Sequence, residues 1–213
     1  MRSTFADRTE AGERLADLLE ERGVTADLVV GVPRGGLPVA AVVAERLGVP
    51  LDIVSARKIG APWNEELAIG AVASDGSTWL NEELIRSAGV DETYIERARR
   101  RERAAARDRV RRYRDDAQAV DLAGKQVVLV DDGVATGATT LACLAALEAA
   151  GAARVTLAVP VAPADTVETL TAAADEVVCV ETPVQFGSVG RFYRTFGQVT
   201  DEEARGYLGS HAR

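Results

Sequence analysis

The second half of the sequence alternates between short apolar runs and longer amphipathic segments, and this pattern constrains the fold more than any other feature. The predicted elements are strand Val127–Val130, helix Thr139–Ala150, strand Val155–Val159, helix Pro163–Ala174 and strand Glu176–Val180. Strands that are apolar throughout are typical of a sheet covered on both faces. Strands and helices in this order form a parallel sheet with helices on its two sides. The pattern therefore predicts an α/β fold with a Rossmann-like parallel sheet flanked by helices.

The first half of the chain continues this pattern. It predicts helix Thr9–Arg22, strand Leu28–Val32, helix Pro38–Leu47 and strand Leu51–Arg57. Strands Ile69–Ala73 and Ser77–Leu80 flank Asp75-Gly76, a dipeptide that favours a hairpin turn. Gly60, Pro62 and Asn64 indicate a long loop over residues 58–68. A total of 213 residues suits a single domain, residues 1–213.

Composition excludes several classes of function. Lys and Arg total 25 against 33 Asp and Glu, and this net charge of −8 argues against nucleic-acid partners. No apolar run reaches the roughly 18 residues of a membrane span, which predicts a cytoplasmic protein without membrane contacts. His211 is the only histidine, so a Ser-His-Asp triad and a His-rich zinc site are excluded. Cys143 and Cys179 form no CxxC pair and are predicted as core residues.

The segment from Val127 to Thr140 carries the chemistry. Asp131 and Asp132 follow a buried strand, at the edge of an open α/β sheet where ligands bind. The small residues and hydroxyls of 135–139 precede a helix, so their N–H groups and the helix dipole favour a phosphate. An ordinary helix cap is the plain alternative, but a cap needs neither the acids nor the small residues. A phosphoacceptor receiver domain needs a lysine after its acids, and none follows Lys125.

This segment resembles the signature of type I phosphoribosyltransferases, which bind phosphoribosyl pyrophosphate. The resemblance implies that Asp131 and Asp132 hold the ribose 2′- and 3′-hydroxyls. It also implies that Mg²⁺ arrives with the ligand, with the same two acids as candidate ligands. The 5′-phosphate would be bound by the loop after them, which consists of Ala135, Thr136, Gly137, Ala138 and Thr139. The family's fold adds a small hood to the sheet.

Basic and glycine-rich segments after the first two strands support the resemblance. Arg34, Gly35 and Gly36 stand where the family has its pyrophosphate loop, and Arg57-Lys58 resembles its basic pair. Arginine offers several planar donors to a phosphate, and glycines allow the backbone to approach it. Arg34, Lys58, Asp131 and Asp132 are therefore the candidate catalytic residues. Residues 58–68 match the family's flexible catalytic loop, most like that of stand-alone members of unassigned substrate.

Two further segments have less specific patterns. The aromatic, Gly-rich tail of residues 182–213 is predicted as the hood or C-terminal cap, with Phe186 stacking on a base. Asp91–Asp116 is an arginine-rich helix whose pairs Glu96–Arg100 and Asp108–Arg112 have the spacing of a solvated, salt-bridged surface. A homo-oligomer contact or an RNA-facing surface is the alternative for this helix.

The expected activity is Mg²⁺-dependent transfer of the phosphoribosyl group to a nitrogen acceptor that resembles a nucleobase, with release of pyrophosphate. The alternative is a non-catalytic regulatory protein that binds phosphoribosyl pyrophosphate or a nucleotide. Ala135 stands where 6-oxopurine enzymes carry an acid, and no lysine follows the motif, which argues against hypoxanthine and guanine. Adenine, a pyrimidine and other acceptors remain open.

Overall fold

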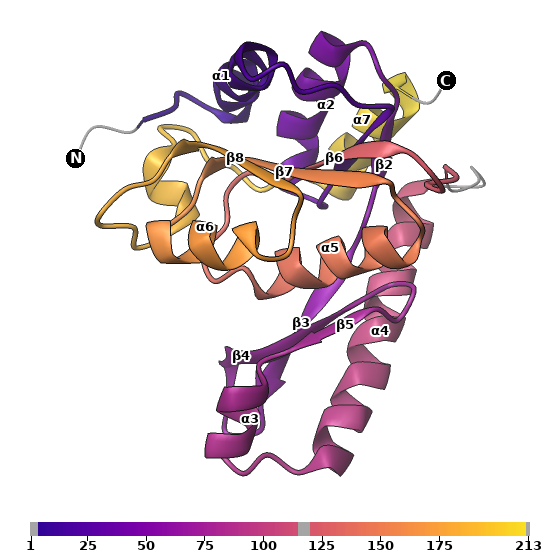
Figure 1. Ribbon diagram of the computed structural model, residues 1–213, viewed down its shortest axis with the longest axis vertical. Helices are drawn as coiled ribbons and strands as arrows, with labels where there is room; N and C mark the ends of the chain where they lie inside the picture. Colours follow the sequence, from indigo (N-terminus) through magenta and orange to yellow (C-terminus); the bar gives the residue numbers. More distant parts are fainter. Residues whose placement is uncertain (1–3, 115–119, 212–213) are drawn as a thin grey trace.

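A computed structural model describes residues 4–114 and 120–211 of the chain. Its centre is a five-stranded parallel sheet in the order β2-β1-β6-β7-β8 (Figure 1). The strands are β1 (Leu28–Gly31), β2 (Leu51–Ile53), β6 (Gln126–Val130), β7 (Arg154–Val161) and β8 (Glu176–Glu181). The predicted parallel sheet is confirmed.

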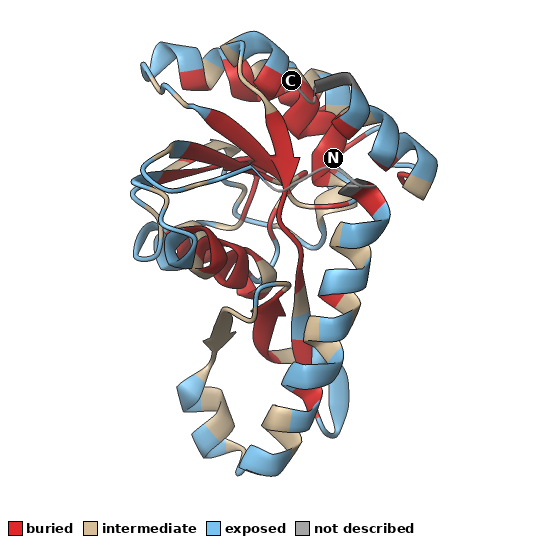
Figure 2. Ribbon diagram, turned by 90° about the vertical axis from the view of Figure 1, so that its right-hand side faces the viewer, coloured by how far each residue is buried: buried red, intermediate tan, exposed pale blue. Residues whose placement is uncertain are grey.

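Helices cover both faces of this sheet, as the apolar strands predict (Figure 1). One face carries α1 (Arg8–Glu21), α2 (Gly36–Leu47) and α7 (Asp201–His211), and the other carries α5 (Ala138–Ala149) and α6 (Ala164–Thr171). Successive residues of each strand point to opposite faces. Val128 and Val130 thus pack with α1 and α2, whereas Val127 and Leu129 pack with α5. Figure 2 shows the buried strands between the helical layers.

A smaller antiparallel sheet projects from the core, in the order β3-β4-β5 (Figure 1). It consists of β3 (Ala56–Ala61), β4 (Asn64–Ala73) and β5 (Thr78–Leu80), and it packs on α4 (Glu92–Arg114). The short helix α3 (Glu82–Ser87), which sequence patterns missed, begins where the Asn81 side chain accepts a hydrogen bond from Leu84 N. The predicted end of the long helix at Asp116 lies outside the described residues.

The prediction of a loop over residues 58–68 is wrong for most of that segment, because β3 and β4 pair there as a hairpin. The register shifts on both sides of Gly60, and a Cβ at this residue would lie 2.5 Å from the carbonyl oxygen of Glu65. The glycine thus marks a β-bulge with a close backbone approach, which leaves the same signal in a sequence as a loop. Likewise, the predicted strand Leu51–Arg57 divides between the two sheets as β2 and β3.

The C-terminal segment from 182 packs back on the start of the chain. A 3-10 turn, Val189–Phe192, is followed by a bridge between Tyr193 and Phe5. Phe5, Phe192 and Tyr193 share a small buried cluster, and α7 contacts α2 and α4. Ala212 and Arg213 lie outside the described residues. No helix in the described part of the chain is long and apolar enough to cross a membrane.

Truncation of Ile59 distinguishes a packed hairpin from a mobile loop. Ile59 is fully buried in the core of the smaller sheet, so Ile59→Ala should lower the free energy of unfolding by about 2–5 kcal/mol. Leu67→Ala is the matched control on the same hairpin, because Leu67 is exposed, and it should cost less than about 0.5 kcal/mol. Urea unfolding measures the change in the free energy of unfolding for each variant. Equal, small effects of the two variants would contradict a packed hairpin.

Candidate active site

The carboxyl ends of β1 and β6 lie side by side at the centre of the parallel sheet. Gly31 pairs with Val130, and the backbone N–H of Val32 donates to the carbonyl oxygen of Val130 at 2.9 Å. The loop that follows each strand therefore leaves the sheet at the same place. One of these loops carries Arg34, and the other carries the two acids.

Two glycines allow these loops to touch. A Cβ at Gly35 would overlap the carboxylate of Asp132, and one at Gly36 would lie 2.8 Å from the Cα of Asp131. Any side chain at either position would therefore push the loops apart. The peptide bond between Pro33 and Arg34 is cis. The structure thus brings the predicted pyrophosphate loop into contact with the predicted ribose-binding acids.

The two acids are held in an environment that disfavours their charged forms. Burial and the neighbouring carboxyl of Asp132 raise the pKa of Asp131 well above its usual range. Burial also raises the pKa of Asp132, although the adjacent Arg8 guanidinium opposes that rise. The backbone N–H of Asp132 donates to Asp131 Oδ1 at 2.8 Å. A pair of this kind is well prepared for a ligand that donates hydrogen bonds or brings a cation.

Arg8 is a residue of the site that the sequence analysis missed. Its Nε donates to Asp132 Oδ2 at 2.8 Å, and both side chains are only 13% exposed. The same guanidinium donates to the carbonyl oxygen of Gly197 and lies 3.9 Å from the ring centroid of Phe196. Arg8 and Asp132 are 124 residues apart, so no local pattern in the sequence links them.

The loop of residues 135–139 has the features that a phosphate requires. Ala135 and Thr136 are exposed, and Gly137 stands before α5 with a φ of 76°. The Thr166 hydroxyl donates to the carbonyl oxygen of Ala135 at 2.8 Å and fixes the loop. The first N–H groups of a helix have no partner within it, so those at the start of α5, from Ala138 and Thr139, remain for a ligand.

The predicted pyrophosphate residues have carboxylate partners in this structure. Arg34 binds Asp201 of α7 at 3.1 Å, and Arg57 binds Glu102 of α4 at 3.2 Å. Lys58 lies on β3, where its Nζ contacts Glu66 Oε2 of the facing strand at 2.7 Å. Lys58 and Glu66 are thus paired with each other across the hairpin.

The predicted base-stacking residue, Phe186, is half-buried and packs on Phe192, with 5.3 Å between ring centroids. Phe196 is another aromatic residue of the predicted cap, to which the sequence analysis gave no stacking role. Its ring contacts both the Arg8 guanidinium and the ring of Tyr193, and 38% of the residue is exposed. The Tyr193 hydroxyl in turn donates to the carbonyl oxygen of Asp132 at 2.6 Å. These contacts connect the C-terminal segment to the acids.

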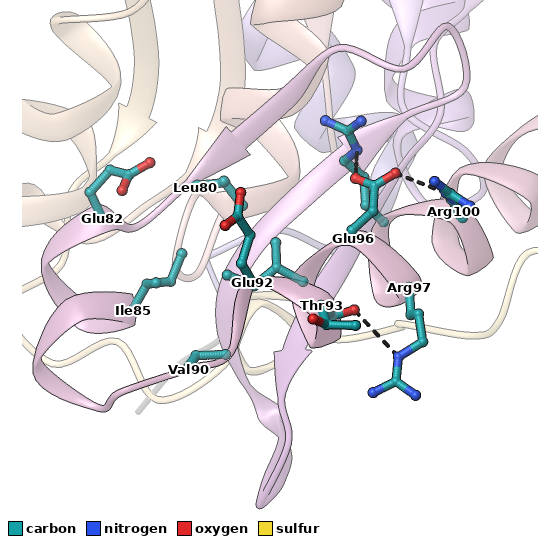
Figure 3. A pocket seen from close by; sticks show the side chains of 11 residues that line it. Leu80, Glu82, Ile85, Val90, Glu92, Thr93, Glu96, Arg97 and Arg100 are labelled. Atoms are coloured by element: carbon teal, nitrogen blue, oxygen red, sulfur yellow. Dashed lines mark hydrogen bonds and ion pairs between the residues drawn. The ribbon is translucent and has the colours of Figure 1, made fainter.

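A pocket of about 850 Å³ lies elsewhere, between β5, α3 and α4 (Figure 3). Its wall includes Leu80, Ile85 and Val90, together with Glu96 and Arg100, which form an ion pair at 2.8 Å. This pair confirms the predicted salt-bridged character of the helix at that position. None of the predicted site residues lines the pocket.

Comparison with known proteins agrees with this site. The model of the phosphoribosyl transferase domain family matches residues 8–191. Two curated proteins of Mycobacterium tuberculosis, MT0597 of strain CDC 1551 / Oshkosh and Rv0571c of strain ATCC 25618 / H37Rv, are each 42% identical over 204 residues. Their names give phosphoribosyl transferase as a provisional activity. The match covers 96% of this chain and 46% of each relative, so the chain spans about half their length.

A solved structure is similar over its full length. The crystal structure of TT1426 from Thermus thermophilus has a TM-score of 0.85 with this chain and is 46% identical, and the match covers 100% of both chains. The residues matched by the family model include Asp131, Asp132, the loop of residues 135–139 and the glycine loop described above. On this sequence and structural similarity, the chain belongs to the phosphoribosyl transferase domain family.

Proposed function

We propose that this chain transfers the phosphoribosyl group of phosphoribosyl pyrophosphate to a nitrogen acceptor and releases pyrophosphate. The observation that carries the proposal is the contact of the Gly35-Gly36 loop with Asp131 and Asp132. With this contact, one ligand could bind with its sugar at the acids and with an anionic group in the loop on each side. A ligand with phosphates at both ends of a ribose fits this order.

Each part of the ligand has a group of residues suited to it. Asp131 and Asp132 would accept hydrogen bonds from the ribose hydroxyls. Residues 135–139 and the start of α5 would bind the 5′-phosphate through N–H groups and the helix dipole. The pyrophosphate would bind at Arg34, Gly35 and Gly36, with Arg57 and Lys58 from β3.

The acids also suit a ligand-borne Mg²⁺. Magnesium prefers oxygen ligands and is commonly held by one or two carboxylates together with substrate phosphates. The described residues contain no group of three or more metal-ligating side chains. Asp131 and Asp132 are the side chains that would hold the ion. When bound, Mg²⁺ would neutralise part of the charge on the pyrophosphate.

The reaction needs positioning and charge stabilisation rather than a covalent intermediate. A nitrogen of the acceptor attacks C1 of the ribose, the bond from C1 to the pyrophosphate oxygen breaks, and the pyrophosphate leaves with the electron pair. The sugar carries positive charge in the transition state, and Asp131 and Asp132 would stabilise that charge from beside the ribose. Arg34 and Lys58 would stabilise the departing anion.

Closure of the β3–β4 hairpin is part of the proposal. Lys58 reaches the ligand only after it leaves Glu66, a residue whose side chain is 87% exposed. A surface ion pair of this kind contributes about 0–1 kcal/mol, so a polyphosphate competes with it easily. Residues 58–68 would then exclude water from the reacting carbon.

The acceptor would bind between this hairpin and the C-terminal segment, with 182–213 as the hood and Phe186 as its stacking residue. The absence of an acid at Ala135 favours an acceptor other than a 6-oxopurine.

Pyrophosphate release from phosphoribosyl pyrophosphate tests the activity directly. With Mg²⁺ and a panel of nucleobases and amines, we expect release that depends on one acceptor class. Tight binding of phosphoribosyl pyrophosphate without release for any acceptor would overturn the enzymatic proposal and favour the regulatory alternative. Assays with and without a chelator measure the dependence on Mg²⁺.

Two variants should separate the two anion sites. Lys58→Ala should weaken pyrophosphate binding and spare ribose 5-phosphate, whereas Thr136→Val should weaken ribose 5-phosphate and spare pyrophosphate. A lost hydrogen bond to a charged group costs about 1.5–3 kcal/mol, or roughly ten- to a hundredfold in affinity. Calorimetry with each ligand in turn, at fixed salt and Mg²⁺, measures the affinity of each variant for pyrophosphate and for ribose 5-phosphate. If each variant weakened both ligands equally, a single shared anion pocket would replace the two sites.

Asp131→Asn should stabilise the ligand-free protein and remove most of its binding of phosphoribosyl pyrophosphate. The raised pKa of Asp131 in the fold means that its charged form costs stability, and this cost grows as the pH rises above the ordinary value of 3.8. The amide should therefore raise the melting temperature at pH 7 and have little effect near pH 3. It should also remove most of the stabilisation that Mg²⁺ and phosphoribosyl pyrophosphate give the wild type.

Glu168→Gln, on the exposed surface of α6, is the control for charge loss and should preserve the ligand-induced shift. A folded Asp131→Asn variant with the full shift would show that this acid does not contact the ligand.

A further inference from the structure

The long helix α4 carries an arginine that the proposed reaction has not used. Arg109 is half-buried, in contrast to the exposed Arg107 and Arg111 beside it. Within the described residues, no carboxylate forms an ion pair with Arg109. A half-buried guanidinium with no counter-ion is costly and calls for an explanation.

The position of Arg109 on the helix places it between two predicted pyrophosphate residues. Glu102, Ala106, Arg109 and Tyr113 recur at spacings of three and four, so they lie along one face of α4. Ala106 and Tyr113 are buried, which shows that this face points toward the rest of the protein. Arg109 therefore lies on the inner face of the helix.

At each end of this face, a side chain of α4 is linked to one of the predicted pyrophosphate residues, Arg57 or Arg34. Glu102 binds Arg57 of β3 at 3.2 Å. At the other end, the Tyr113 hydroxyl donates to Asp201 Oδ1 at 2.7 Å, and the same oxygen binds Arg34 at 3.1 Å. Arg109 thus lies between the anchor of Arg57 and the anchor of Arg34.

The electrostatics agree with this placement. Burial and then the positive charges of Arg57, Arg34 and Arg112 lower the pKa of Arg109. Asp201 also binds Arg112, at 3.3 Å. Among the described residues, Arg34 and Arg112 share the carboxylate of Asp201, and Arg57 pairs with Glu102. Arg109 pairs with neither acid, so these four guanidinium groups have more positive charge than the two carboxylates beside them offset.

We propose that Arg109 is a pyrophosphate-binding residue, which α4 supplies between Arg34 and Arg57. This inference deepens the proposed function, on which it rests, and it gives the arginine-rich helix a part in the site. The missing counter-ion of Arg109 is then the ligand itself. A diphosphate has enough charge and enough oxygen atoms to engage several guanidinium groups at once, whereas the single carboxylate of Asp201 engages Arg34 and Arg112.

Arg109→Gln tests the inference, with Arg107→Gln as the matched control. Both changes remove one positive charge from the same helix, but Arg107 is exposed. Calorimetry with inorganic pyrophosphate and, separately, ribose 5-phosphate, at fixed salt and Mg²⁺, measures the binding. Arg109→Gln should weaken pyrophosphate by about ten- to a hundredfold and leave ribose 5-phosphate within about twofold. Arg107→Gln should change neither by more than about twofold.

A stability measurement separates binding from a structural role. Because its neighbours disfavour the charge of Arg109, Arg109→Gln should keep or raise the melting temperature of the ligand-free protein. Arg109→Lys, which keeps the charge without the planar guanidinium, should restore part of the pyrophosphate affinity.

Several results would overturn the inference: unchanged pyrophosphate affinity in Arg109→Gln, equal losses for both ligands, or a wild-type protein that does not bind pyrophosphate. The proposed enzymatic activity fails by a different result. If pyrophosphate binds through Arg109 but no acceptor supports its release from phosphoribosyl pyrophosphate, the anion site stands and the transferase activity does not.

Discussion

The contact between the glycine loop after β1 and the acids after β6 is the constraint on which the site depends. It requires that two neighbouring parallel strands end at the same level, and the register of Gly31 with Val130 meets this requirement. It also requires residues without side chains at 35 and 36, because a Cβ at either would displace the acids. The sheet and the two glycines together determine how closely the loop of Arg34 approaches Asp131 and Asp132.

Burying two adjacent carboxyl groups is unfavourable, and the surrounding structure offsets part of that cost. Arg8 neutralises Asp132 from α1, and Tyr193 holds the backbone of the same residue from the C-terminal segment. Phe196 packs on both Arg8 and Tyr193 and so links these two residues. The two acids are thus held by residues near both ends of the described chain. Asp131 keeps a raised pKa because burial and the carboxyl of Asp132 outweigh the charge of Arg8.

Sequence patterns predicted the features that depend on short-range order. The parallel sheet and its flanking helices followed from apolar runs and helical periodicity. The two acids and the loop of residues 135–139 followed from one continuous segment. The patterns failed where distant contacts decide the outcome. Gly60 indicated a loop but forms a bulge against Glu65, and the predicted partner of Arg112 was Asp108, whereas Arg112 contacts Asp201. Arg8 and Arg109 had no local signal, because their neighbours come from other elements.

The junction of Arg8, Asp132 and Tyr193 has a consequence for folding. Its contacts join residues separated by 124 and 61 positions, so they form only after long stretches of chain have come together. During synthesis, β1, β2 and β6 emerge long before Tyr193. For that period the acids lack one of the groups that hold them. The order of synthesis therefore leaves the candidate site incomplete until the last part of the sheet and its following segment are in place.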